Sequence, residues 1–507
     1  MSTLAPVTIT APGFGGLNTQ DSPVSMPIEY ASAADNCVID QFGRIAARKG
    51  YLVQTTSGAP DILDPITSIG YFEDEAGNTQ VYSANSANIY SGIETLTSVY
   101  TLNVTAGNWQ YINFNEQMIF LQTGHSPLVA SAGGAPSLLN PTVSTGPAES
   151  VDGANVGLGA FGRLWLADTT LQKSVIYWSD LLNPAVFNAG SSGRIDLNDV
   201  WPQGQDEVKA LAAHNGFLII FGQHSILIYQ GADDPSTMTL ADTIKGVGCI
   251  ARDSVQLCGN DLMFLSSEGV RSLGRVVQEK SLPNRDISGT VRDDVIAFVK
   301  ASIDKSLIKS VYSPEESFYV LSFPSAEAAF VFDLRRPLEN GYLRATRWIG
   351  SPFLAMTRDW NVGTLYAAGR QGIGIYDGYQ DNGTSYQMKY FTHFLNFDQP
   401  VGLKFLKKIR PIIIGTSESS AIIRWSYDFN ESTTAQALPL EGLSASEYGT
   451  AEWGIGEFGP ATGLNVLNIN TNGSGTLVKV GIEVEVNGSE FSIQELTMYA
   501  TIGRTAW

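Results

Sequence analysis

Short apolar runs separated by polar or glycine-rich turns dominate the pattern along the chain. The stretch HNGFLIIFGQHSILIYQG is typical, because FLIIF and ILIY have strand character and GQHS between them can form a turn. The same arrangement recurs, so we predict a series of β-hairpins through the central part of the chain. They cover residues 78–92, 115–130, 161–179, 214–231, 260–274, 316–334 and 363–378.

The hairpins recur at similar distances. A repeat of about 40–50 residues with several strands per unit is typical of β-propeller blades, which bury their faces against one another around an axis. We therefore predict an all-β fold with a β-propeller of about seven degenerate blades, with six or eight left open. A β-sandwich followed by unrelated β domains is the alternative. The first strands start near Val81, Met118, Leu164, Phe217, Leu262, Phe318 and Leu365, in steps of 37 to 56 residues.

Two regions lie outside this period. Residues 1–60 hold Pro- and Gly-rich segments with few strand signals, which predicts an extended N-terminal arm before a propeller over 61–385. Residues 386–507 contain apolar runs such as KKIRPIIIGT and TLVKVGIEVEV, which predict a C-terminal β-sandwich-like domain. Helix is scarce, and the best short candidates are YASAADNCVI (30–39) and VRDDVIAFVKASI (291–303).

Composition agrees with a β protein and restricts its partners. The 507 residues are 16% charged and 10% aromatic and include 51 glycines, which suits strands better than helices. The net charge of −19 gives a surface that repels free nucleic acid and anionic membranes. No apolar run approaches the roughly 18 residues of a membrane span, and the N-terminus lacks the pattern of a signal peptide. Three cysteines without CxxC spacing, namely Cys37, Cys249 and Cys258, indicate a protein made in a reducing cytoplasm.

No motif of established chemistry stands out. His214 and His224 lie in one hairpin without further close ligands, so we interpret them as turn and strand-edge residues. GVGCIA (246–251) matches part of a dinucleotide fingerprint, but a strand-like sequence follows it where a helix is required. GIGIYDG (372–378) has the character of a glycine-spaced strand end. We therefore predict no catalytic, cofactor-binding or metal-binding residues and no enzymatic activity.

Charged residues leave two questions open. A propeller glycosidase needs a positioned pair of carboxylates, but we interpret the acidic residues as solvated loop acids because no repeated SxDxGxxW turn accompanies them. Arginines cluster in 43–50, 269–275 and 333–337, where they are candidate subunit contacts or ordinary surface charge. The acidic residues considered are Asp196, Asp206, Glu207, Asp233, Asp234, Asp293 and Asp294.

Several phrases together resemble a known family. The segment FGGLNTQDSPVSMPIEYASAADNCVIDQFGRIAARKGY (14–51) resembles the opening of hub or nozzle tail proteins from short-tailed bacteriophages, a family that includes packaged-DNA stabilisation proteins and tail tubular proteins. Its matching positions are Gly15 to Asn18, Asn36 to Asp40, Gly43, Arg44 and Arg48 to Tyr51. Similar phrases follow to about residue 380: FGRLW (161–165), VIYWSDLLNP (175–184), IFGQHSILIYQG (220–231), GVGCIARDSVQ (246–256), NDLMFLSSEGVRSLGR (260–275) and VFDLRR (331–336).

This resemblance implies a structural role in the virion tail. Members of the family sit below the portal and the ring of adaptor subunits, as a homo-hexamer around the axial channel. They retain packaged DNA and then form its exit conduit, without sequence-specific binding, and tail fibres or tailspikes and sometimes a needle or plug attach nearby. The resemblance carries no catalytic residue and no cofactor, and it implies no contact with a membrane.

A different class of function stays open beside this one. The chain could instead be a propeller-based polysaccharide-degrading tail protein, or its C-terminal domain could bind glycans. New reducing ends on host polysaccharide, or glycan binding by residues 386–507, would favour that alternative.

Overall fold

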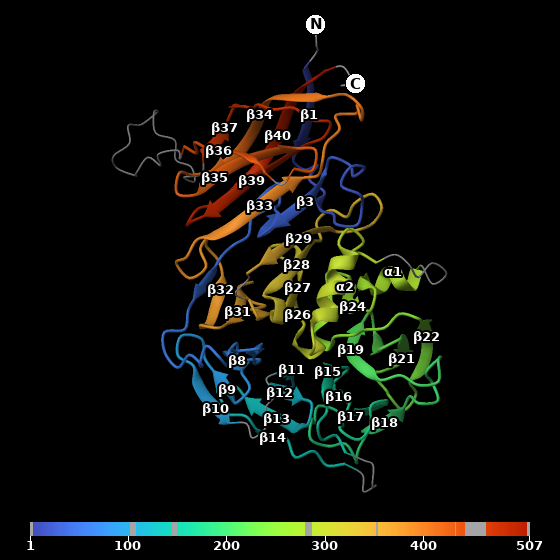
Figure 1. Ribbon diagram of the computed structural model, residues 1–507. Coiled ribbons are helices and arrows are strands. Elements are labelled where there is room, and N and C mark those ends of the chain that lie inside the picture. Colours follow the sequence, from blue (N-terminus) through green and yellow to red (C-terminus); the bar gives the residue numbers. More distant parts are fainter. Residues whose placement is uncertain are drawn as a thin grey trace, which may run out of the picture.

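The computed structural model describes residues 4–101, 108–143, 150–278, 286–350, 353–430, 432–441 and 463–503. A ring of small antiparallel sheets forms the lower body in Figure 1, and two larger sheets form the upper body, where both chain ends lie. The ring is a β-propeller, as the spacing of hairpins predicted. Among the described residues, no helix has the length and apolar character required to cross a bilayer.

Four consecutive blades occupy residues 68–245, and each has four strands in chain order from the axis outwards. Tight turns with residues in the left-handed region join the strands, as at Asn215 (φ 49°) and Gly216 (φ 80°). The blades are β7 (Ser68–Glu73), β8 (Thr79–Ala84), β9 (Asn88–Ser91) and β10 (Thr97–Thr101); β11 (Gln110–Phe114), β12 (Gln117–Gln122), β13 (His125–Ser131) and β14 (Ser137–Leu138); β15 (Val156–Ala160), β16 (Arg163–Ala167), β17 (Val175–Trp178) and β18 (Gly193–Asp196); and β19 (Val208–His214), β20 (Phe217–Gly222), β21 (Ser225–Gln230) and β22 (Thr239–Lys245).

Three further sheets complete the ring. The first has three strands and follows the short 3-10 helix η1 (Arg252–Ser254); helix α1 continues the chain where a fourth strand would run. The last blade takes its outer strand from the N-terminal segment, so the two ends of the propeller sequence close the ring. The elements are β23 (Gln256–Cys258), β24 (Asp261–Ser266), β25 (Gly269–Ser272), α1 (Leu273–Gln278) and α2 (Arg292–Ala301); η2 (Lys305–Leu307), β26 (Lys309–Ser313), β27 (Phe318–Phe323), η3 (Pro324–Ala326), β28 (Ala328–Asp333) and β29 (Arg344–Ile349); and β30 (Ala355–Arg358), β31 (Leu365–Gly369), β32 (Gly372–Tyr376) and β6 (Tyr51–Val53).

The blade count differs slightly from the prediction. The described residues form six complete four-stranded blades, one fewer than the seven expected. The hairpin at 260–274 was counted as a full blade, but its sheet stops at three strands because the chain turns into α1 after Ser272. Its inner strand β23 contacts β26, and the adjoining η1 contacts β19, so this smaller sheet still fills its place in the ring.

Two sheets packed face to face form the upper body, as the apolar runs after residue 386 predicted. One sheet has the order β37-β34-β40-β5-β4, with β1 added to β40 and β38 added to β34. The other runs β3-β33-β39-β35-β36, with β2 beside β3, and it continues the blade of β26–β29 through the parallel bridge Arg347–Asp35. The strands are β1 (Leu4–Thr10), β2 (Gly16–Leu17), β3 (Tyr30–Asp35), β4 (Cys37–Ile39), β5 (Ile45–Ala47), β33 (Tyr386–Thr392), β34 (Lys404–Gly415), β35 (Ser420–Tyr427), β36 (Thr434–Leu438), β37 (Gly463–Val466), β38 (Ile469–Asn470), β39 (Val478–Val486) and β40 (Ser492–Ile502).

The N-terminal segment differs from the predicted extended arm. Its described part contributes five strands to the sandwich and one, β6, to the propeller. The helix expected at 30–39 is also wrong, because this segment forms β3 and β4; the helix expected at 291–303 is confirmed as α2. Small residues such as Ala31 and Ala34 point inwards from β3, so tertiary packing outweighs their helix propensity.

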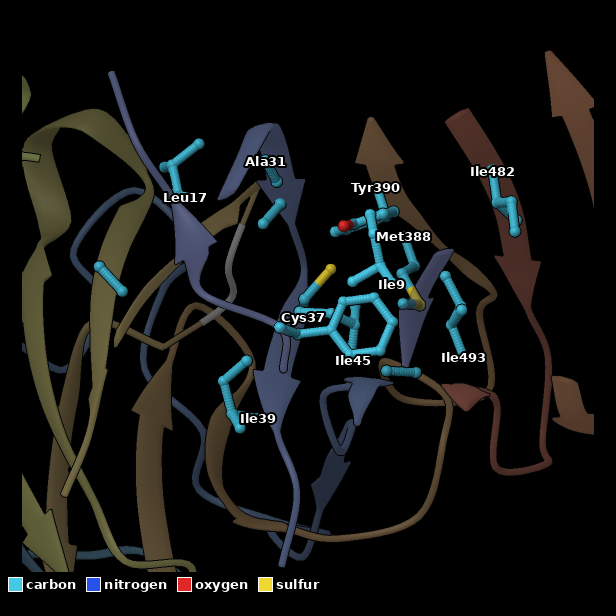
Figure 2. Close-up of a cluster of buried hydrophobic side chains, with 14 of the residues drawn as sticks. Ile9, Leu17, Ala31, Cys37, Ile39, Ile45, Met388, Tyr390, Ile482 and Ile493 are labelled. Carbon is cyan, nitrogen blue, oxygen red and sulfur yellow. The ribbon is translucent and has the colours of Figure 1, made fainter. Parts of the chain in front are cut away.

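One continuous hydrophobic core joins the two bodies. Figure 2 shows side chains from both sandwich sheets pointing towards one another, among them Ile9 of β1, Tyr390 of β33 and Ile493 of β40. The same buried cluster continues into the propeller through Phe330 and Phe332 of β28. The sandwich is therefore packed on the propeller and is not a separately tethered domain.

Candidate functional site at the propeller axis

The inner strands of the ring surround a cavity of about 300 Å³ at the propeller axis. Residues from β7, β11, β19, β23, β26 and β30 line it, so nearly every sheet of the ring contributes to its wall. Most of these side chains are polar, and three are charged. Those on which the chemistry depends are Ser68, Tyr111, Arg252, Asp253, Gln256 and Lys309.

The three charged residues form one ion-pair network. The Arg252 guanidinium contacts both carboxylate oxygens of Asp253, with Nε 2.7 Å from Oδ1 and Nη2 2.8 Å from Oδ2. The Lys309 ammonium lies 2.5 Å from Oδ2 of the same carboxylate and also donates to the Asn108 side chain. The network fastens the sheet of β26 to the loop that enters the neighbouring sheet of β23.

Arg252 also contacts Asn155 and lines a second cavity. Its Nη1 donates to the backbone oxygen and to Oδ1 of Asn155, both at 2.7 Å. A second cavity of about 310 Å³ lies beyond it, lined by Asn155, Asp168, Lys209 and Arg252 itself. Arg252 therefore lies in the wall of both cavities.

Burial and charge set the protonation states of the network. Burial raises the pKa of the Asp253 carboxyl, but Arg252 and Lys309 outweigh that effect and hold it at about 2. Burial also lowers the pKa of the Lys309 ammonium, and the attraction of Asp253 opposes this. The Asp253 carboxyl is therefore ionised near neutral pH, so the network holds a permanent negative charge between its two cationic side chains.

The hairpin 214–231 is confirmed as part of a blade, and its two histidines are far from each other in the fold. His214 ends β19 at one face of the propeller, whereas His224 lies in the β20–β21 turn at the other. His214 contacts the side chain of Asn215, and His224 is exposed. Within the described ranges, no three His, Cys, Asp or Glu residues are grouped so that they could hold a metal ion.

Asp206 is a structural residue that the sequence reasoning missed. It was expected to be a solvated loop acid, but only 5% of it is exposed. Its carboxylate accepts hydrogen bonds from the backbone of Gln223 (2.8 Å) and His224 (2.9 Å) and from the Ser225 hydroxyl (2.8 Å). It thereby fixes the β20–β21 turn from a preceding loop. Asp196, Glu207, Asp233, Asp234 and Asp293 are exposed, and Asp294 is half-buried.

The segments with partial cofactor or cysteine motifs are structural. GVGCIA leads through a loop into η1 and not into a long helix, so it lacks the helix N-terminus of a dinucleotide site. GIGIYDG contains β32, as expected for a strand end. All three cysteines are free and buried, and burial raises the pKa of the Cys249 thiol to about 11, which keeps it protonated near neutral pH.

Arginines proposed as subunit contacts lie largely inside the chain. Arg44 and Arg48 are buried and pair with Asp40 and Asp381. Arg335 donates to the backbone oxygen of Ile39 at 2.8 Å, and so connects β28 to the N-terminal segment. Arg44, Arg48 and Arg335 therefore contact residues of their own chain, whereas Arg336 is exposed.

Comparisons with known proteins identify no family for the chain. No family model and no curated protein matches the chain. The WD40 domain of Neurospora crassa Pan2 is similar at 11% identity, with a TM-score of 0.38, over 65% of this chain and 94% of that one. Kluyveromyces lactis Hsv2 is similar at 12% identity, with a TM-score of 0.31, over 57% of this chain and 99% of that one. At this level of identity, neither likeness carries functional information.

Proposed function

We propose that the protein is a structural, non-enzymatic subunit of the tail of a short-tailed bacteriophage. Six copies form a hub or nozzle below the portal and adaptor, help to retain packaged DNA and line its exit path. The proposal comes from the phrases at 14–51 and at intervals up to residue 336, which resemble that family. The protein is made in the bacterial cytoplasm and ends in the virion tail.

The positions of the family-like residues support this proposal. Asn36 donates to the backbone oxygens of Ile349 (3.2 Å) and Gln387 (2.7 Å), and so links the propeller to the sandwich. Arg48 pairs with Asp381 at the same joint. Buried polar contacts that hold two bodies in a fixed relation suit a rigid scaffold. These contacts support the proposal, which rests chiefly on the family-like phrases.

Under this proposal, DNA passes through a ring of copies and not through one propeller. The cavity that the described residues form at the axis of a single propeller is about 300 Å³, which has no room for a DNA duplex. A ring requires heterologous contacts that close by rotation. At −19 per chain, six copies would carry a formal charge of −114, and acidic walls would lower the affinity for phosphates and let DNA slide. A channel wall rich in lysine and arginine would count against this part of the proposal.

The experiment is to produce phage particles without this protein and to measure their DNA content. We expect heads that package DNA and then lose it, so that emptied capsids accumulate. Adding the purified protein to freshly filled particles should restore DNA retention. Particles that keep their DNA and eject it normally would overturn the proposal. Incubation of the protein with host polysaccharide, with new reducing ends as the readout, distinguishes the enzymatic alternative.

A further inference from the structure

The axial cavity holds more positive than negative charge. Among its lining residues, Arg252 and Lys309 are cationic and Asp253 is the one acidic residue. Their side chains are buried, with 4%, 9% and 17% of the surface exposed for Arg252, Lys309 and Asp253. The chain as a whole has 50 acidic and 31 basic residues, so this local balance is opposite to the overall one.

The two cations share a single carboxylate. Oδ1 of Asp253 accepts from Arg252, and Oδ2 accepts from both Arg252 and Lys309. Their further hydrogen bonds go to neutral oxygens of Asn108 and Asn155. Charges buried in proteins are normally paired, because an uncompensated one is costly. The network of Arg252, Lys309 and Asp253 therefore carries one net positive charge, and Asp304, which does not belong to the network, attracts Lys309 at longer range.

The adjoining space fits a small counter-ion. A water molecule occupies about 30 Å³ of liquid, so a cavity of about 300 Å³ has room for a small ligand and not for a polymer. Ser68 and Tyr111 line the same cavity. Their hydroxyl groups, 3.0 Å apart, are further hydrogen-bonding groups in its wall. Guanidinium and ammonium groups are the usual partners of carboxylates and phosphates.

We propose that the axial cavity binds a small oxyanion, carried on a phosphate or a carboxylate group, that balances the charge of Arg252 and Lys309. The site is independent of the tail assignment, because it depends only on the charges and the volume at the axis of one chain. Bound oxyanion would tie the sheets of the ring together at their centre and stabilise the propeller.

Gln256→Glu tests the site most directly. Gln256 lines the same cavity, and its side-chain amide donates to the backbone oxygen of Ser310 at 3.1 Å. The substitution keeps the size of the side chain and supplies the missing negative charge. The matched control is Gln230→Glu, an exposed residue whose amide lies 3.1 Å from the Thr239 hydroxyl.

Inorganic phosphate and acetate are titrated at constant ionic strength into the full-length protein, with calorimetry and thermal unfolding as readouts. We expect saturable binding of at least one of them, unchanged in Gln230→Glu and about tenfold or more weaker in Gln256→Glu. The comparison of phosphate with acetate distinguishes the two oxyanion sources. No saturable binding of either anion to the unaltered protein would overturn the proposal, as would equal binding by both variants. If Gln256→Glu fails to fold, Tyr111→Phe, which removes one hydroxyl and keeps the ring, should weaken binding several-fold, and unchanged binding in that variant would overturn the proposal.

Discussion

The guanidinium of Arg48 and the carboxylate of Asp381 form a two-pronged pair at the joint between the propeller and the sandwich, with Nη1–Oδ1 at 2.9 Å and Nη2–Oδ2 at 2.6 Å. Arg48 has no exposed side-chain surface, and its guanidinium carbon lies 4.1 Å from the centre of the Tyr386 ring. The pair joins residues 333 positions apart in the sequence. It fixes the segment that leads from the sandwich into β6 and therefore into the closing blade.

Replacing Arg48 with Met should strongly destabilise the protein. It leaves the Asp381 carboxylate without its partner, and loss of one partner of a buried pair costs about 3–5 kcal/mol. Urea unfolding measures the change in the free energy of unfolding. The matched control is Arg370→Met, because Arg370 and Glu327 form an exposed pair worth about 1 kcal/mol or less. Equal losses in the two variants would contradict the assigned role of Arg48.

Asp206→Ala should destabilise the blade of β19–β22, whereas His224→Ala should not. Removing the Asp206 carboxylate leaves buried donors at the β20–β21 turn without an acceptor, at about 1–3 kcal/mol for such a group. His224 has an exposed side chain, and its removal should change stability by no more than about 0.5 kcal/mol. Thermal unfolding of both variants checks the order. A larger loss for His224→Ala would show that the histidine has a role the structure does not explain.

A strand or site could be predicted from the sequence only where the residues that contact one another lie close together along the chain. The hairpin at 214–231 was predictable because its strands and turn are adjacent in sequence. The strands β3, β5 and β6 were not, because each pairs with a strand more than 300 residues away, as in the pairing of Tyr51 with Tyr376. The axial network was missed for the same reason. Asn108, Asn155, Arg252 and Lys309 belong to separate segments, and although Arg252 lies in the family-like phrase at 246–256, no motif links the four.

Asp253→Asn should lower stability near neutral pH, and the loss should fade in acid. The folded-state pKa of Asp253, about 2, lies below its ordinary value of 3.8. The ionised group therefore contributes stability above about pH 4, and this is lost as the pH falls through about 2. A shift of this size corresponds to about 2 kcal/mol. Urea unfolding between pH 7 and pH 2 follows the difference between the proteins, and Asp196→Asn at an exposed position is the control. A difference that stays constant over this range would contradict the ion-pair assignment.

Mild acid should destabilise the sandwich through His393. Burial lowers the pKa of this imidazole below 6.5, while its Nδ1 lies 3.4 Å from the backbone oxygen of Tyr30. The folded state therefore binds fewer protons than the unfolded state, and stability falls as the pH decreases from about 7 through 6.5. His393→Leu should show a smaller loss between pH 7.5 and pH 5.5 than the unaltered protein in urea unfolding. His224→Ala should keep the full dependence, and an identical pH dependence in all three proteins would refute the role of His393.

The most direct test of the proposed tail role is imaging of phage particles with the protein marked by gold or by an added domain. The account predicts that density for the protein lies on the tail axis below the adaptor, with six-fold symmetry and an open central channel between copies. A protein that is monomeric in solution and assembles only on the particle gives the same density on the tail axis. Density off the axis, or a protein that never joins the particle, would contradict the account.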